Sequence, residues 1–467
     1  MTGDSSANSQ YWTPERIRGL VDEERGWIDP RIFSEQALFD LEMERVFARS
    51  WLFLGHESQL KAPGDYINTY MGNDSVIVVR QKDGGIAAFL NMCAHRGMKL
   101  CRADFGKAKA FTCSYHGWSY DLDGDLIHVP MEKEAFHGQL DKDKWGLRRV
   151  PRLELRYGMI FGTWDENAPS LRDYLGEMDW YLGQFLDRAD GGVEFVGGCH
   201  KWVIPCNWKF AAEQFGSDMY HADQTHVSVK LAHLPPDFDP SKVMFPREST
   251  QFSAGLGHCI GFWTNHKAVA DLGVLQPILG ERGAAYYGGE GRQKAAARLG
   301  ETRAYKIASA HATVFPNLSY LAGSHTLRVW HPRGPGEIEV WAFTVLDKGL
   351  PDGIGNDWRR GVARTFSPAG IFEQDDGENW AEIQHSLRGF KARSTRLNVE
   401  MGLGHARSDD PDFPGRTNYG YAEEGARGFY RQWASMMSGV DWPDLLRQSS
   451  AWNEAPRASH LSASADA

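Results

Sequence analysis

The sequence predicts an α+β protein, with a small all-β domain and a larger domain whose antiparallel sheet is flanked by helices. Short runs of strand-forming residues fill positions 50–165, separated by the turn sequences KAPG, GND and KDGG. After residue 170 the pattern changes to amphipathic helices and longer runs of alternating polarity. A chain of 467 residues is too long for the small domain alone, so roughly 300 residues remain for at least one further core.

Two helical pieces are expected in the first 49 residues, after a short polar segment. Residues 1–10 are rich in Ser and are expected to be disordered. Pro14 follows Thr13, which is a suitable cap for the first piece, and Pro30 separates that piece from the second. The second piece is expected to start near Ser34 and to pack through one apolar face.

The small domain is expected to consist of short antiparallel strands. Four runs precede a loop that contains Cys and His, and three more lie around a second such loop. The expected strands cover residues 51–54, 65–71, 75–80, 86–90, 109–112, 118–121 and 159–164. A compact antiparallel domain of this size is therefore predicted over residues 50–165.

The larger domain is expected to be formed by residues 1–49 and 166–455. The Gly- and Ala-rich stretch 267–302 is interpreted as an irregular or partly helical cover over a pocket. The polar tail 456–467 is expected to be flexible. Helices are predicted at 171–187, 371–392 and 422–438. Strands are predicted at 193–204 and, as three members of one antiparallel sheet, at 312–321, 325–331 and 338–346.

Composition and charge exclude several classes of partner. The formal net charge is −10 and no block of Lys and Arg is present, which argues against nucleic acid. No run reaches the 18 or so apolar residues of a membrane span, and the N-terminus lacks the features of a signal peptide. The six cysteines have no disulfide-scaffold spacing, so a reducing cytoplasm is expected.

Two pairs of metal-ligand residues lie close together in the small domain. Cys93 and His95 form a CxH pair, Cys113 and His116 form a CxxH pair, and 17 residues separate the pairs. A Rieske [2Fe–2S] cluster needs two Cys on one iron and two His on the other, which two such loops can supply. One alternative is a structural zinc site, although zinc spacings usually pair Cys with Cys and His with His. The other is chance placement.

A second group of candidate ligands lies in the sequence NWKFAAEQFGSDMYHADQTHVS, at residues 207–228. Asp218 and His221 are three residues apart and are expected to share a helix face. His226 can converge with His221 only if the helix ends or distorts near Asp223. Two His and one carboxylate on one face of an iron are typical of non-haem Fe(II) oxygenases.

Spacing alone does not identify the carboxylate that would complete such a site. In FEQDDGENW, Asp375 and Asp376 fall on a predicted helix between Glu373 and Glu378, so acidity does not choose among them. Two ordinary histidines at a helix end are the alternative interpretation of HxxxxH, because this spacing is a weak signal by itself. A Rieske centre in the same chain favours the iron site, because it would supply that iron with electrons.

These motifs resemble those of the large subunits of aromatic ring-hydroxylating dioxygenases, over residues 51–442. The first is similar to the family's Rieske signature CxHx₁₇CxxH, and NWKFAAEQFGSDMYH…H and FEQDDGENW are similar to its iron-binding motifs. Residues 330–347 and 382–394 look like the biphenyl/toluene branch of the family. The resemblance implies that residues 50–165 form the Rieske domain and that the rest of the chain forms the catalytic domain.

The resemblance also implies roles for single residues. Asp218 matches the carboxylate that links a Rieske His of one subunit to an iron-ligand His of the next, so His116 of a neighbour would meet Asp218. Such a carboxylate fixes both imidazoles and shortens the electron path. The implied ligands of the [2Fe–2S] cluster are Cys93, His95, Cys113 and His116, and those of a mononuclear Fe(II) are His221, His226 and Asp376. The implied pocket lining is Gln214, Phe215, Met219, Ala222, Phe366 and Phe372.

The sequence departs from single branches of the family at two points. Gln214 stands where the naphthalene branch has Asn. Four residues separate His221 from His226, as in that branch, whereas biphenyl enzymes typically have five. The chain is thus mixed between branches, and its pocket is not assigned to one substrate. The implied lining suits a flat hydrocarbon ring, with core packing as the alternative for Phe366 and Phe372.

The activity implied by the resemblance is that of the terminal oxygenase in a multicomponent enzyme. Both atoms of O₂ would be added to an aromatic hydrocarbon to give a cis-dihydrodiol, which consumes two electrons, whereas one [2Fe–2S] cluster stores one. The sequence contains no GxGxxG fingerprint, so NAD(P)H would act only through a separate ferredoxin reductase and ferredoxin. A small beta subunit and an α3β3 or α3 assembly are also implied.

Three other functions agree with parts of the sequence. A Rieske monooxygenase or demethylase would use the same metal sites but would place one atom of O₂ in the product. A non-catalytic Rieske electron-transfer protein would leave roughly 300 residues and the second ligand group unused. A zinc-stabilised binding protein would be colourless, whereas a Rieske protein should be red-brown.

Overall fold

The computed structural model describes residues 11–233, 245–271 and 275–454, and its chain divides into two compact units. The smaller unit spans residues 47–171, and the larger one combines residues 1–46 with 172–467. The smaller unit is all-β apart from short helical segments, and the larger one is a sheet with helices, so the predicted α+β class is confirmed. The disorder predicted for residues 1–10 and the flexibility predicted for 456–467 concern segments outside the described residues.

The strands of the smaller unit form three small antiparallel sheets, with the orders β6-β5-β4-β7, β10-β9-β8 and β11-β12-β3. Their bounds are β3 (Leu52–His56), β4 (Asp65–Met71), β5 (Asp74–Arg80), β6 (Ile86–Leu90), β7 (Phe105–Lys107), β8 (Phe111–Thr112), β9 (Ser119–Tyr120), β10 (Leu126–His128), β11 (Arg152–Arg156) and β12 (Met159–Thr163). The helical segments are η3 (Glu57–Gln59), α4 (Glu132–Phe136) and η4 (Lys142–Trp145). All seven predicted strands are found, two of them with unchanged bounds.

Three strands of this unit were not predicted, and each has a local reason. β7 and β10 have three residues each, which is too short for a period to show in the sequence. β11 reads RLELR and no residue in it is fully buried, although it pairs residue for residue with β12. Pairing with a buried neighbour, and not hydrophobic alternation, therefore defines this strand.

The N-terminal residues 11–46 add short elements to the larger unit. Thr13 caps the first helix as predicted, because its Oγ1 accepts from the backbone N–H of Arg16. The second helix begins after Glu35 instead of Ser34 and turns into a π-helix after Glu42. The elements are α2 (Pro14–Arg18), β1 (Val21–Asp22), β2 (Trp27–Ile28), η1 (Pro30–Phe33), α3 (Gln36–Glu42) and η2 (Met43–Phe47).

A buried charged network fixes this N-terminal piece to the rest of the larger unit. Glu42 accepts from the Nζ of Lys209 at 2.5 Å, and both side chains are almost completely buried. The indole N–H groups of Trp208 and Trp433 also donate to Glu42, at 2.8 and 2.7 Å. Three donors thus satisfy the carboxylate, which a buried charge requires.

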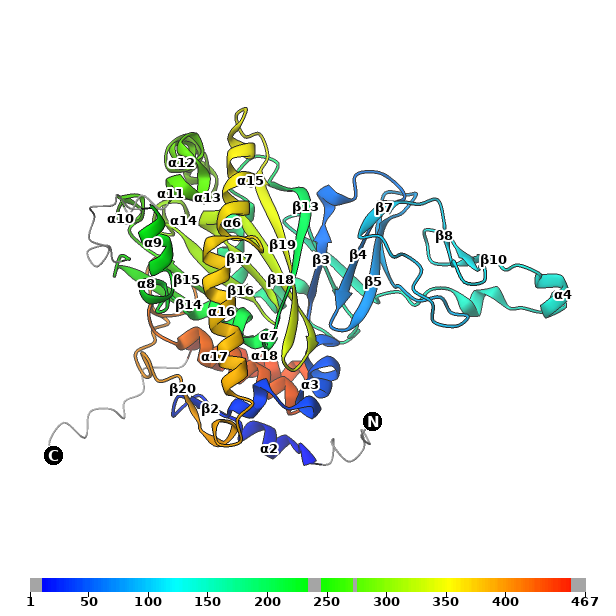
Figure 1. Cartoon of the computed structure of the whole chain (residues 1–467), viewed down its shortest axis with the longest axis horizontal. Helices are drawn as coiled ribbons and strands as arrows, with labels where there is room; N and C mark the ends of the chain where they lie inside the picture. Colours follow the sequence, from blue (N-terminus) through cyan, green and yellow to red (C-terminus); the bar gives the residue numbers. More distant parts are fainter. Residues whose placement is uncertain (1–10, 234–244, 272–274, 455–467) are drawn as a thin grey trace. The chain divides into compact units, whose positions relative to one another are not determined.

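Within the described residues, the larger unit contains an eight-stranded antiparallel sheet in the order β13-β19-β18-β17-β16-β15-β14-β21 (Figure 1). The predicted strand 312–321 is two strands separated by a tight turn, and the hairpin β14–β15 was not predicted. The bounds are β13 (Val193–Ile204), β14 (Ser249–Ser253), β15 (Cys259–Trp263), β16 (Ala310–Val314), β17 (Leu318–Leu321), β18 (Thr326–Gly334), β19 (Glu337–Asp347) and β21 (Arg416–Tyr419). A further short strand, β20 (Leu397–Asn398), pairs with β2.

Helices cover this sheet and connect its strands. The predicted helix 171–187 is two helices, because Gly176 adopts a positive φ of 50° between them. The stretch 267–302 is mainly helical, and α15 and α18 were not predicted. The bounds are α5 (Leu171–Leu175), α6 (Met178–Leu186), α7 (Trp208–Ser217), α8 (Ala222–Thr225), α9 (Val227–His233), α10 (His266–Asp271), α11 (Leu275–Leu279), α12 (Glu281–Gly288), α13 (Glu290–Leu299), α14 (Glu301–Tyr305), η6 (Ala322–Ser324), α15 (Ile354–Thr365), α16 (Ile371–Ser386), η7 (Ala392–Ser394), α17 (Glu424–Met437) and α18 (Trp442–Glu454).

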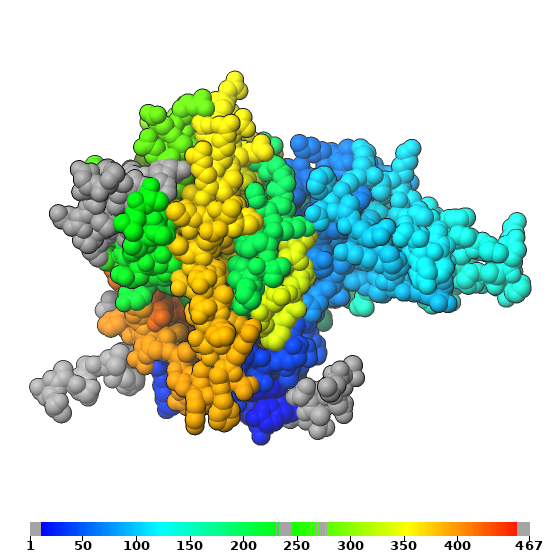
Figure 2. Space-filling view, viewed as in Figure 1, coloured from blue at the N-terminus to red at the C-terminus, as the bar shows by residue number. Residues whose placement is uncertain are grey.

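Helices α16 and α9 lie side by side on the surface of the larger unit, as the orange and bright green segments of Figure 2 show. Helix α7 packs against the central strands β15 to β18. The predicted ligand motifs on α16 and after α7 are therefore brought to one place. Throughout the described ranges, every helix is too short or too polar to cross a membrane.

The buried His258 predicts an acid-sensitive fold. Its Nε2–H donates to the carbonyl of Tyr174 and its Nδ1 accepts from the N–H of Phe315, an arrangement that only the neutral ring can make. Burial lowers the pKa of His258 to about 4. The neutral His258 ring thus contributes fully to the free energy of unfolding above pH 6.5, and this contribution is lost as the pH falls from 6.5 through 4. The loss amounts to about 3 kcal/mol. In urea titrations between pH 7 and 4, His258→Gln should flatten this fall in stability, and an unchanged slope would contradict the assignment.

Candidate active site

The end of helix α7 is held by side chains from the sheet below it. Helices leave their last carbonyls without intrahelical partners, and here strands β14 and β16 supply donors to Phe215 and Ser217 and, earlier in the helix, to Ala212. Gly216 allows the close approach, because a Cβ there would lie 2.1 Å from the Sγ of Cys259 on β15. The donor and acceptor pairs are Thr313 Oγ1 to Ala212 O at 2.6 Å, His311 Nδ1 to Phe215 O at 3.0 Å and Gln251 Nε2 to Ser217 O at 2.5 Å.

The expectation that Asp218 and His221 share a helix face is wrong. Helix α7 ends at Ser217, Asp218 follows it with non-helical dihedral angles, and His221 directly precedes α8. The helix therefore breaks five residues earlier than the break expected near Asp223. This earlier break brings the rings of His221 and His226 together edge to face, with their centroids 5.1 Å apart.

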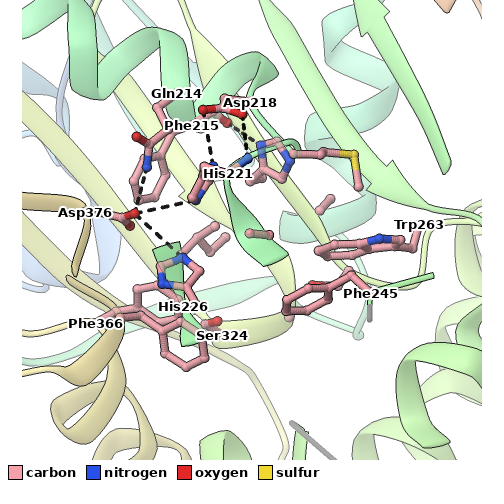
Figure 3. A pocket seen from close by; sticks show the side chains of 18 of the residues that line it. Gln214, Phe215, Asp218, His221, His226, Phe245, Trp263, Ser324, Phe366 and Asp376 are labelled. Carbon is pink, nitrogen blue, oxygen red and sulfur yellow. Dashed lines mark hydrogen bonds and ion pairs between the residues drawn. The ribbon is translucent and has the colours of Figure 1, made fainter. Parts of the chain in front are cut away.

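Three side chains converge at the opening between α7, α8 and α16 (Figure 3). The Nε2 atoms of His221 and His226 lie 3.5 and 3.7 Å from the same Oδ1 of Asp376. One ligand atom from each of the three residues lies within 4.8 Å of the others, so the group could hold a metal ion. Two imidazoles and a carboxylate on one side of a metal leave its other positions open.

The opposite nitrogen of each imidazole faces a second carboxylate. Asp218 lies 3.3 Å from the Nδ1 of His221, and Asp375 lies 3.4 Å from the Nδ1 of His226. Ser228 donates to Asp375 at 2.7 Å and so fixes it. Such carboxylate–histidine pairs orient metal-binding rings and leave the other ring nitrogen for the metal.

The structure thus distinguishes between the four acidic residues that the sequence spacing could not tell apart as the third ligand. Asp376 faces both Nε2 atoms, while Asp375 is on the far side of His226. Glu373 is buried in an ion pair with Arg328, at 2.8 Å, and Glu378 is exposed. Only Asp376 among these four therefore occupies the position of a third ligand.

The electrostatic field at this site favours a cation. Burial alone would lower the pKa of His221, but the carboxylates of Asp218 and Asp376 raise it to about 9. Burial raises the pKa of Asp218, and His221 outweighs this, so that the carboxyl group is more acidic than usual. A site that attracts a proton this strongly also attracts a metal ion, so the donor set fits Fe(II).

A cavity of about 890 Å³, counting the part open to solvent, extends from the three converging residues. It contains two stacked aromatic pairs: Phe366 with Phe372 at 4.9 Å, and Phe245 with Trp263 at 5.3 Å between centroids. The structure places all six residues of the implied lining on this cavity: Gln214, Phe215, Met219, Ala222, Phe366 and Phe372. Lining residues that sequence reasoning missed include Phe245, Trp263, Val269, Ile278, Ser309, His311, Leu321 and Ser324.

Gln214 and Arg328 support the walls of this cavity. Gln214 donates to Asp376 at 2.9 Å and accepts from the indole of Trp380 at 2.7 Å, so both ends of its amide are used. The guanidinium of Arg328 lies 4.8 Å from the ring of Phe215 and 5.1 Å from that of Phe366. Its charge therefore lies close to two lining rings while Glu373 neutralises it.

In the smaller unit, the two loops with Cys and His have matching backbones. In each loop the Cys N–H donates to the carbonyl five residues later, and the Cys carbonyl accepts from a Gly N–H at 2.9 Å. These residues, Gly97 and Gly117, have φ of 72° and 75°, which favours Gly. The two loops thus have the same backbone conformation, as expected for two loops that bind one metal group together.

The side chains of these loops converge as well. Cys93 and Cys113 are buried free thiols in one core cluster, whereas His95 is half-buried and His116 is exposed. The Nδ1 atoms of the two histidines lie 3.1 Å apart. Two imidazole nitrogens that approach this closely, next to two thiols, fit a shared metal group with mixed ligation.

Two family models match the chain and cover most of it. The description "Rieske [2Fe-2S] domain" matches residues 50–150, and "Ring hydroxylating alpha subunit (catalytic domain)" matches residues 179–439. The chain therefore belongs to the family of ring-hydroxylating alpha subunits, oxidoreductases of the Rieske non-haem iron type. The resemblance seen in the sequence is confirmed, and so is the cofactor pair of a [2Fe–2S] cluster and a mononuclear iron.

Curated relatives match the chain over nearly its whole length. Benzene 1,2-dioxygenase subunit alpha from Pseudomonas putida is 53% identical over 93% of this chain and 96% of its own length. Biphenyl 2,3-dioxygenase subunit alpha from Rhodococcus jostii is 52% identical over 93% and 94%. The large oxygenase component of a naphthalene 1,2-dioxygenase system from Pseudomonas aeruginosa is 36% identical over 90% and 94%. These names describe single components of larger enzymes.

Solved structures share the fold. Naphthalene 1,2-dioxygenase with indole in its active site has a TM-score of 0.84 and 35% identity, covering 93% of this chain and 97% of its own. A quaternary ammonium Rieske monooxygenase has a TM-score of 0.64 but only 18% identity, covering 91% and 99%. The fold is therefore common to both oxygenase types, and the sequence relatives favour the ring dioxygenases.

Proposed function

We propose that this chain adds both atoms of O₂ to adjacent carbons of an aromatic ring and forms a cis-dihydrodiol. The proposal rests mainly on one arrangement, in which His221, His226 and Asp376 open into a cavity with aromatic walls. The overall balance is one arene, one O₂, two electrons and two protons for each dihydrodiol. A bound Fe(II) would supply O₂ activation at this site.

The side chains around the site have separable tasks in this proposal. His221, His226 and Asp376 are the iron ligands, and Asp375 fixes the ring of His226 through its Nδ1. Gln214 orients Asp376 by donating to its Oδ1. The stacked pairs of aromatic residues orient a flat ring and exclude water from it.

Electrons are proposed to enter through a cluster held by Cys93, His95, Cys113 and His116. The side chain of Asp218 is 34% exposed although its carboxylate lies 3.3 Å from the Nδ1 of His221. His116 of a neighbouring subunit is also exposed and could donate to Asp218. This pairing requires a ring of alpha subunits, for which α3 or α3β3 with a small beta subunit is proposed.

The remaining parts of the system are proposed to be separate proteins. NAD(P)H would reduce a ferredoxin reductase, which would reduce a ferredoxin that delivers single electrons to the cluster. Cytoplasmic location follows from the same requirement for reducing partners. The proposed domain bounds are 50–165 for the Rieske domain, and 1–49 with 166–455 for the catalytic domain.

Reconstitution with isotope-labelled oxygen tests this function. The chain is co-expressed with a beta subunit of a relative, mixed with a surrogate ferredoxin, a reductase and NADH, and given benzene, biphenyl and naphthalene under ¹⁸O₂. The product should be a dihydrodiol with two labelled atoms, and the chain alone should not oxidise NADH. A single labelled atom would instead identify a monooxygenase, which the shared fold permits.

A further inference from the structure

The cavity contains a polar corner that neither the metal site nor the fold uses. Ser324, at the end of η6, lines the cavity and is only 6% exposed. Figure 3 shows it on the His226 side, across from Gln214 and Asp218. Ser309, just before β16, lines the same cavity. Within the described residues, neither hydroxyl has a hydrogen-bond partner, and both face the cavity.

Most of the other polar side chains of the lining are already committed. Both ends of the Gln214 amide are bonded, and Asp218, His221, His226 and Asp376 form the metal site. The Nδ1 of His311 donates to Phe215, and its Nε2 is buried without a hydrogen-bond partner, as a ring nitrogen and not a hydroxyl. Of the described lining, Ser309 and Ser324 therefore remain as the hydroxyls available to a ligand.

Gly323 keeps the space between the two serines open. A Cβ at this position would lie 2.6 Å from the Oγ of Ser309, which is too close for any side chain without a shift. The walls beside this corner are the stacked rings of Phe366 and Phe372. A flat ring on these walls would bring a small substituent within reach of the two hydroxyls.

We propose that Ser324 and Ser309 select aromatic substrates that carry a small hydrogen-bonding substituent, a hydroxyl or an amino group. This inference rests on the proposed function and names the substrate class of the same cavity. A hydroxyl that faces the cavity loses its hydrogen bonds to water when a substrate fills the cavity, and a substrate O–H or N–H that pairs with it recovers this cost, whereas a methyl group does not. The two serines are specificity-determining residues and leave the chemistry at the iron unchanged.

Substrate pairs of equal size test this selection. Phenol is compared with toluene, and 3-hydroxybiphenyl with 3-methylbiphenyl, because hydroxyl and methyl are similar in volume. In the reconstituted enzyme, kcat/KM should favour the hydroxylated member of each pair. Ser324→Ala should lower this preference by about three- to tenfold, mainly through KM of the hydroxylated substrate, as expected for one neutral hydrogen bond. Ser309→Ala should lower it as well, and the double variant should lower it most.

A matched control separates this role from a general effect of removing a buried serine. Ser367 is 4% exposed, its hydroxyl donates to the carbonyl of Ala363, and it does not line the cavity. Ser367→Ala should therefore keep the parent preference. An equal preference in parent and Ser324→Ala enzymes that oxidise both substrates would overturn the inference alone. Failure of the parent to oxidise any of the four compounds would instead contradict the proposed function.

Discussion

Asp376→Asn should abolish ring oxidation, while Asp375→Asn, one residue away, should only weaken it. Asp376 is the carboxylate that faces both Nε2 atoms, so the amide removes the negative charge from the proposed iron site. Asp375 contacts the Nδ1 of His226 and acts through that ring. Loss of a residue that hydrogen-bonds to a metal ligand typically lowers activity by about 10- to 100-fold, and we expect a loss in this range for Asp375→Asn. Loss of the ligand itself should cost more, so activity should fall by more than about 100-fold for Asp376→Asn.

Metal analysis and spectroscopy distinguish this result from misfolding. The Asp376→Asn enzyme should lose mononuclear iron but keep the red-brown colour and the electron paramagnetic resonance signal of the reduced Rieske cluster. The Asp375→Asn enzyme should bind iron with lower affinity, so excess Fe(II) should restore part of its activity. If Asp375→Asn were the iron-free variant, the ligand assignment would be reversed.

Asp218→Asn should stop turnover with both metal centres in place. In the proposed assembly, Asp218 accepts from His221 and from His116 of the neighbouring subunit, and an Asn amide cannot accept both bonds in the same way. The steady-state rate of ring oxidation should fall by at least about 100-fold. This loss reaches or exceeds the largest one typical of residues that hydrogen-bond to a metal ligand. Stopped-flow absorption should show that the reduced cluster is oxidised slowly after mixing with substrate and O₂.

The control for this prediction is Asp375→Asn, which alters the corresponding carboxylate of the other histidine. This variant should oxidise its reduced cluster at nearly the parent rate once iron is bound. An Asp218→Asn enzyme with normal cluster oxidation would show that electrons reach the iron by another route. Loss of iron from Asp218→Asn would instead assign Asp218 to the support of His221 only.

The strands and ligands that depend on local sequence could be predicted, and those that depend on distant partners could not. Strands β4, β6 and β13 have the predicted bounds, because each combines strand-forming residues with clear turn signals. The hairpin of β14 and β15 was missed, because its residues are recognised as strands only beside β16 and β21. Helix α15 was missed although it is amphipathic, because Gly residues interrupt its sequence.

The candidate site also combines features that the local sequence predicts with features that depend on distant residues. Its His and Asp residues are visible as motifs, but the break after Ser217 that makes them converge is produced by His311 and Gln251 on the sheet. The polar residues Ser309 and Ser324 carry no signal in the sequence, since isolated serines occur throughout the chain. Their significance comes from the absence of a partner, which only the three-dimensional arrangement of the described residues reveals.

The buried pair of Glu42 and Lys209 constrains when the larger unit can fold during synthesis. Glu42 is made before the whole smaller unit, yet its partners are 167 and 391 residues further along, at Lys209 and Trp433. An emerging chain therefore lacks the ammonium partner of Glu42 until nearly half of it has been made, and it lacks the indole of Trp433 until nearly all of it has been made, while residues 47–171 can already be compact. Any shortened gene that begins after the smaller unit would leave Lys209 as a lone ammonium in an apolar interior, and its product should be insoluble.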